Sequence, residues 1–105
     1  MVFLCLNNCV KKHSPPLPAM VDFNFDVKPI LVQKCYLCHG PDSSGRKGGL
    51  RLDTFEGATA TLKEGGSAII PGHPGDSKLI FRINSDDPEL VMPPPETKLS
   101  LTERE

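Results

Sequence analysis

Two cysteines and a histidine, Cys35, Cys38 and His39, follow one another with the spacing Cys-x-x-Cys-His. On a helix, residues three apart lie on one face, so both thiols can add to the two vinyl groups of a single porphyrin. The imidazole of His39 is then held beside the iron as its proximal ligand. The pentapeptide therefore predicts one covalently bound c-type haem and, through it, electron transfer.

The same three side chains are also compatible with two other kinds of site. A redox dithiol of the thioredoxin type needs a preceding strand, whereas the residues before Cys35 have the pattern of a helix. A structural zinc ion normally takes four protein ligands, which the haem motif alone does not supply. The zinc alternative therefore remains open, and its ligands would be Cys35 and Cys38 with two of Cys5, Cys9, His13 and His39.

Met92 is the candidate for the second axial ligand, because it is the only methionine after the haem motif and thioether sulfur suits haem iron. The three prolines at 93–95 disfavour a helix after it and predict an extended loop that presents the sulfur to the distal face. His73 is the other histidine after the motif, but Pro71 and Pro74 place it in a tight turn. A peroxidase-like open site would require that Met92 does not ligate, and the sequence shows no distal acid–base pair to support it.

Several sequence blocks surround these residues in one order. From about Val21 onward the chain resembles the planctomycete-type cytochrome c domain, a small c-type haem module usually found in larger secreted proteins. The resemblance implies haem on Cys35 and Cys38, His39 as proximal ligand and Met92 as distal ligand. It also implies an electron carrier or electron-entry domain, not an enzyme, in the periplasm or otherwise outside the cytoplasm. The blocks that carry it are 25–31, 38–42, 49–53, 70–74, 77–83, 85–88 and 92–95.

Length and composition fit one small domain that gains core volume from a cofactor. A chain of 105 residues that is 38% hydrophobic buries a modest core, and an apolar porphyrin would extend it. Eleven prolines and nine glycines predict long irregular connections between short helices. The net charge of −1 gives no indication of a nucleic-acid partner, and no apolar run is long enough to span a membrane. The redox partner is not identified by charge.

The expected fold is mostly α, with three helices in a small cytochrome c-like domain. Asp26 is the predicted N-cap of a helix that ends near Cys38, with Pro29 in its first turn. Further helices are expected from about residue 54 to 63 and from about 77 to 84. Between the first two lies a polar loop whose basic residues could pair with haem propionates or simply face water: Arg46, Lys47 and Arg51.

The two ends of the chain look different from its middle. Residues 1–20 are expected to form an extended or disordered arm, with the haem domain at 21–105. A secretory signal places basic residues before its apolar core, whereas here the apolar residues precede Lys11 and Lys12. Thr102 and Glu105 have the spacing of a capping box, which predicts the start of a helix. The resemblance implies a C-terminal helix at this point, so we expect a haem domain that is incomplete at its C-terminus and part of a larger protein.

Overall fold

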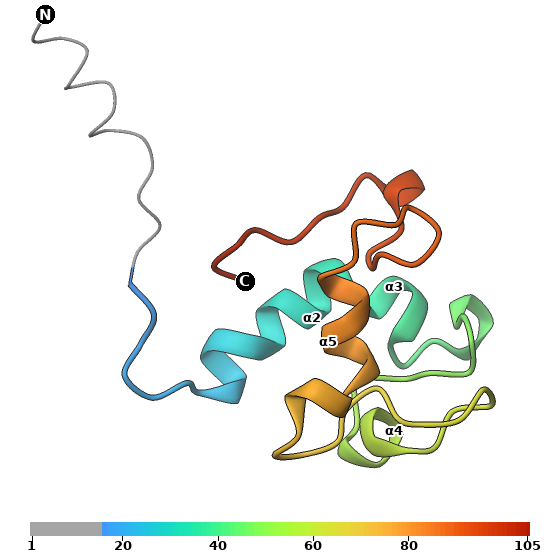
Figure 1. The fold of residues 1–105 in the computed structure, drawn as a ribbon, viewed down its shortest axis with the longest axis horizontal. Helices are drawn as coiled ribbons and strands as arrows, with labels where there is room; N and C mark the ends of the chain where they lie inside the picture. Colours follow the sequence, from blue (N-terminus) through green and yellow to red (C-terminus); the bar gives the residue numbers. More distant parts are fainter. Residues whose placement is uncertain (1–15) are drawn as a thin grey trace, which may run out of the picture.

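Short helical segments joined by long loops make up the fold of residues 16–105, which are the residues that the computed structural model describes (Figure 1). No strand occurs in this part of the chain, where β pairing is limited to one isolated bridge between Thr61 and Ser67. The expectation of a small, mostly helical domain with Pro/Gly-rich connections is therefore confirmed. In chain order the segments are η1 (Phe23–Val27), α2 (Lys28–Lys34), α3 (Tyr36–His39), η2 (Ser43–Gly45), α4 (Phe55–Thr59), η3 (Pro74–Asp76), α5 (Lys78–Ile83) and η4 (Pro95–Thr97).

The first helical run begins four residues earlier than expected. Asp22, and not Asp26, is the N-cap, and its carboxylate accepts a hydrogen bond from the amide of Phe25 at 3.0 Å. Asp26 returns the interaction by accepting from the amide of Asp22 at 2.8 Å. The prediction of an Asp26 cap was wrong because this second carboxylate, inside the first turn, is the reciprocal partner of the true cap.

The same run is interrupted at Cys35, which lies between the two helices as the C-cap of α2 and the N-cap of α3 (φ −125°, ψ −33°). The interruption is small, because the amide of Cys35 still donates to Leu31 and the amide of His39 donates to Cys35, both at 2.9 Å. Cys38 therefore remains about one turn from Cys35, as a single helix would place it.

Of the two later helices, α4 is shorter than expected, whereas α5 (Lys78–Ile83) covers nearly the expected range. Thr54 caps α4 by accepting from the amide of Gly57 at 3.0 Å, but α4 ends at Thr59 and not near Lys63. Ser77 stands at the N-cap position of α5, although its hydroxyl bonds backward to the amide of Ile70 at 2.8 Å. The glycines at 65 and 66, both at positive φ, form a turn beyond the end of α4.

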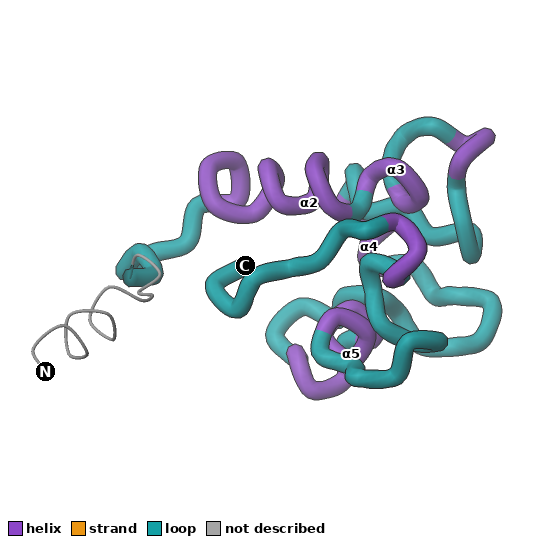
Figure 2. Tube along the Cα trace, turned by 90° about the horizontal axis from the view of Figure 1, so that it is seen from above, coloured by secondary structure: helices purple, strands orange, loops and turns teal. Residues whose placement is uncertain are grey.

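The hydrophobic core of the described residues is small, consisting of Leu52, Ala58 and Ala68. Partly buried side chains from the thiol-bearing helices and from α5, among them Leu31 and Leu79, pack against it. Figure 2 shows that α2 and α5, which overlap in Figure 1, are separated in depth. No large side chain of the described residues is fully buried.

The C-terminal segment runs back along α2 (Figure 1). Lys34 donates to the carbonyl of Ser100 and, at 3.1 Å, to the carboxylate of Glu105. Thr102 and Glu105 form the predicted capping box, since each amide donates to the other's side chain at 2.9 and 3.2 Å, but residues 102–105 are not helical. None of the helices in residues 16–105 has the length and apolar character of a membrane span. Cys5, Cys9, His13 and most of the expected arm lie outside the described residues.

Candidate functional site

An apolar cavity opens between α3, the loop that follows it, α5 and the loop that carries Met92. The four side chains singled out in the sequence, Cys35, Cys38, His39 and Met92, all line it. Most of the remaining lining is aliphatic and comes from every part of the domain: Leu37, Leu50, Leu52, Leu62, Ala68, Leu79, Ile83 and Leu99, with Pro93 and Pro94. The two thiols and the imidazole, which are neighbours in sequence, therefore share one hydrophobic space with a thioether from a distant part of the chain.

The proximal side of the cavity is built from α3 and the segment at residues 50–52. The Nδ1 atom of His39 lies 3.1 Å from the carbonyl oxygen of Leu50, and the amide of Leu52 donates to the carbonyl of His39 at 2.6 Å. With its proton on Nδ1, the imidazole donates to Leu50 and keeps the lone pair of Nε2 for a metal. The Leu50–Leu52 segment, expected to be extended, thus orients the ring.

The loop after α3 closes back on the end of that helix. Gly40 is buried, and a Cβ atom there would lie 2.5 Å from the carbonyl oxygen of Tyr36, so only glycine allows this turn directly after His39. The Arg46 side chain donates to the carbonyls of Gly40 and Pro41 at 3.1 and 3.2 Å. The amide of Lys47 donates to the backbone carbonyl of Cys38 at 2.9 Å. Carbonyls that a helix C-terminus leaves unpaired are satisfied here by the following loop.

The basic residues of this loop have different partners from those considered in the sequence. Arg51 forms two hydrogen bonds to Asp53, of 2.7 and 2.5 Å, and this pairing lowers the pKa of the Asp53 carboxyl. The guanidinium of Arg46 is engaged by backbone carbonyls, as above. Of the three basic residues, Lys47 alone lines the cavity. Lys47 therefore stays a candidate for a propionate, whereas Arg46 and Arg51 already have protein partners.

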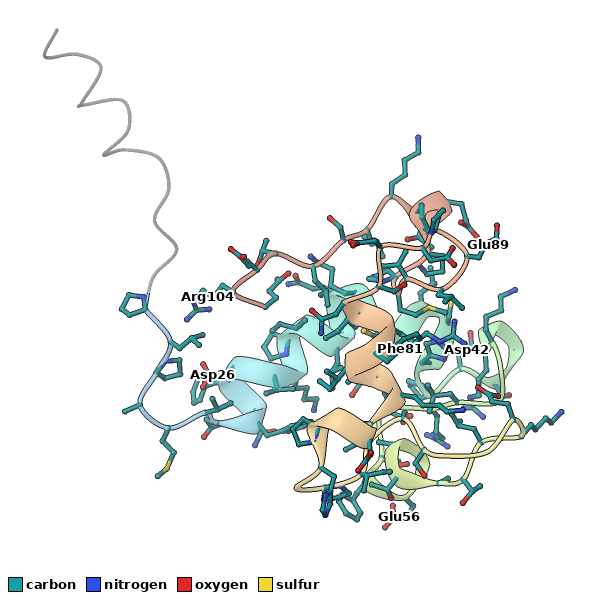
Figure 3. The ribbon with its side chains drawn as sticks, in the orientation of Figure 1. Asp26, Asp42, Glu56, Phe81, Glu89 and Arg104 are labelled. Atoms are coloured by element: carbon teal, nitrogen blue, oxygen red, sulfur yellow. The ribbon has the colours of Figure 1, made fainter. Side chains whose placement is uncertain are left out.

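The distal side of the cavity is built from α5 and the loop at residues 84–93, on which Figure 3 labels Glu89. Asp87 organises the loop, because its carbonyl accepts from the amides of Leu90 and Val91 at 2.9 Å. The amide of Met92 then donates to the carbonyl of Arg82 at 3.2 Å, which ties the methionine to the end of α5. Pro93, directly after it, is buried. Met92 thus lies in a loop before prolines, as predicted, but α5 holds it in position.

Cationic side chains gather at the cavity. Lys34, Lys47, Lys78 and Arg82 line it, together with one acidic residue, Glu64. Burial raises the pKa of the Cys35 thiol, and the charge of Lys34 partly opposes that increase. Sequence reasoning did not find Lys34, although it directly precedes Cys35, and it did not find Lys78 or Arg82, whose approach to the cavity depends on contacts between distant segments. An anionic group at the cavity would meet a mainly positive surround.

The alternatives considered for the sequence receive less support. His73 is exposed and does not line the cavity. Within residues 16–105 no three cysteine, histidine or acidic side chains converge as a group that could hold a metal ion. The further zinc ligands required by that alternative, Cys5, Cys9 and His13, are not among the described residues.

The residues present fit a covalently attached haem. Both cysteines are free thiols on one side of the cavity, and the histidine next to them has its other ring nitrogen committed to a carbonyl. The lining is largely apolar, which suits the faces of a porphyrin, while the lysines and Arg82 suit its carboxylates. The donor set of imidazole nitrogen and thioether sulfur is one that haem iron accepts.

Comparison with known proteins agrees with this geometry. The sequence model of the family described as planctomycete cytochrome C matches residues 35–96, from the first cysteine of the haem motif to just beyond Met92. Neither the curated proteins nor the solved structures compared with the chain include a significant match. Because the match covers more than half of the sequence, the chain belongs to the planctomycete cytochrome C family, whose members are c-type cytochromes that serve in haem-based electron transfer.

Proposed function

We propose that this chain carries one covalent haem c and passes single electrons between redox partners, with His39 and Met92 as axial ligands. The observation that carries the proposal is the convergence of both thiols, the His39 imidazole and the Met92 thioether on one apolar cavity. When bound, the haem supplies the one-electron Fe(II)/Fe(III) couple. Electron transfer of this kind requires no substrate site.

The protein's own residues have three tasks in this proposal. Cys35 and Cys38 attach the porphyrin, and the Leu50 carbonyl holds His39 with Nε2 available for the iron. The aliphatic lining excludes water and so disfavours the additional positive charge of the oxidised iron. This effect raises the reduction potential of the haem, and a methionine ligand also raises it. Lys47, Lys78 and Arg82 offer donors for the propionates.

The haem domain is proposed to extend over residues 21–105 and to act outside the cytoplasm, in the periplasm of a bacterium, as one module of a larger protein. Family membership supports the extracytoplasmic setting, because attachment of haem to Cys-x-x-Cys-His takes place there. The redox partner is a protein, and the net charge of −1 provides no basis for nucleic-acid binding.

A reduced pyridine haemochrome spectrum tests the attachment. The protein is produced with periplasmic haem-attachment machinery and an added export signal, and the sample is extracted with acid–acetone. A c-type α-band that survives extraction is expected. A colourless product with one bound zinc ion would contradict the proposal and favour the zinc site built on Cys35 and Cys38 with Cys5 and Cys9.

A further inference from the structure

Arg82, near the end of α5, contacts the methionine loop through both its backbone and its side chain. Its carbonyl accepts from the amide of Met92 at 3.2 Å, and its Nη1 donates to the carbonyl of Leu90, also at 3.2 Å. The two hydrogen bonds hold Leu90 and Met92, the residues on either side of Val91. Arg82 is partly buried and lines the same cavity as Met92.

The loop needs such a contact because the hydrogen bonds around Asp87 are internal to it. The Asp87 carboxylate accepts from the amide of Glu89, and its carbonyl accepts from the amides of Leu90 and Val91. These bonds lie within the loop and do not set its distance from the rest of the domain. The guanidinium of Arg82 stays charged, so its bond to a carbonyl is stronger than one between neutral groups. It spans from α5 to the residue pair that precedes Met92.

We propose that Arg82 is a positioning residue for the sixth ligand: its guanidinium holds the 90–92 segment so that the Met92 sulfur stays on the iron. This inference rests on the proposed function, because it requires Met92 to be an axial ligand. It assigns to a cavity-lining arginine a role that acts through the methionine loop and not through contact with the iron.

The test compares Arg82→Gln and Arg82→Lys with two control variants of the haem-loaded protein. Asn84→Ala is the matched control, because that side chain also donates to a backbone carbonyl, that of Ile80 at 2.9 Å, at the end of α5 but outside the cavity. Lys63→Gln removes one exposed charge outside the cavity. The readouts are the methionine-to-ferric-iron charge-transfer band and the affinity of the ferric protein for imidazole, which competes with the sulfur.

Arg82→Gln is expected to weaken the band and to increase imidazole affinity about ten- to hundredfold, the range typical of lost outer-shell contacts at a metal. Arg82→Lys, which keeps the charge, should give a smaller increase, and both controls should match the wild type. If Arg82→Gln yields no haem-loaded protein, Arg82→Lys is compared with the controls in its place. An unchanged band and affinity in the Arg82 variants would overturn the inference.

A second background separates a positioning role from a simple charge effect. With Met92→Ala, the position that imidazole occupies is already open, so adding Arg82→Gln should leave imidazole affinity unchanged. An equal increase in both backgrounds would show that Arg82 acts through its charge, and the inference would be wrong. If the wild type itself lacks the methionine band and Met92→Ala changes nothing, the axial assignment of Met92 fails instead.

Discussion

The two sides of the cavity are held in different ways. On the proximal side, the thiols and His39 lie within five consecutive residues, and the loop of residues 40–52 bonds back to the helix that carries them. On the distal side, Met92 lies in a loop whose position depends on α5 through Arg82. Local helix geometry therefore prescribes one ligand, and tertiary contacts prescribe the other. We expect the proximal side to tolerate perturbation of the fold better than the distal side.

The largest effect should follow from removing the proximal attachment. In the double variant Cys35→Ala/Cys38→Ala no thioether bond can form, so essentially no haem should remain with the protein after acid–acetone extraction. The measurement is the pyridine haemochrome spectrum before and after extraction. Ser43→Ala, an exposed hydroxyl close to the motif, is the control and should retain all its haem. Full retention in the double variant would mean that the cysteines do not carry the cofactor.

The next largest effect should follow from removing the distal ligand. Met92→Ala should keep the covalent haem but lose the methionine charge-transfer band, and the reduction potential should fall by on the order of 0.1 V, because axial ligands tune haem potentials over about 0.8 V. Equilibrium redox titration measures the change. Met20→Ala is the matched control, since that methionine is 84% exposed. An unchanged potential would mean that Met92 is not an axial ligand. The comparison of the two sides would then no longer hold for the distal side.

A moderate effect is expected at the base of α5, which supports the distal side. Ser77 is 5% exposed, accepts from the Ile70 amide at 2.8 Å and donates to the His73 carbonyl at 3.0 Å. Ser77→Ala should lower the free energy of unfolding by about 1–3 kcal/mol, because it leaves a partly buried amide without its partner. Urea denaturation of the haem-loaded protein measures the loss. Ser100→Ala, on the exposed C-terminal segment, should change stability by less than about 0.5 kcal/mol.

The smallest effect should be a pH dependence on the proximal side. The hydrogen bonds from Arg51 lower the pKa of Asp53 in the folded protein below its unfolded value, which is about 3.9. The stabilisation is therefore complete above the unfolded pKa and is lost as the pH falls through the lower, folded pKa. Thermal unfolding should show a stability gap between wild type and Asp53→Asn at pH 6 that narrows in acid. Arg51→Gln should behave alike, and a gap that widens in acid would contradict the assignment.

Sequence reasoning was accurate where the structure depends on short-range interactions. The helical character around Cys35 and Cys38 and the capping-box contacts of Thr102 and Glu105 were predicted. The predicted cap at Asp26 was wrong, because Asp22 caps the Phe25 amide while Asp26 accepts from the amide of Asp22, and only geometry assigns these two roles. The extent of the second predicted helix was also overestimated, since α4 ends at Thr59.

By itself, the sequence determined the chemistry of this protein. Thiols three residues apart, with an imidazole next to them, favour covalent haem, because the match between a helical turn and a porphyrin edge is local. Only the tertiary structure decided what meets that cofactor from the other side. The convergence of Met92 with the two thiols and the approach of Lys78 to the cavity both join segments distant in sequence. No pattern within a short window encodes such contacts, because they exist only once the chain has closed around the cavity.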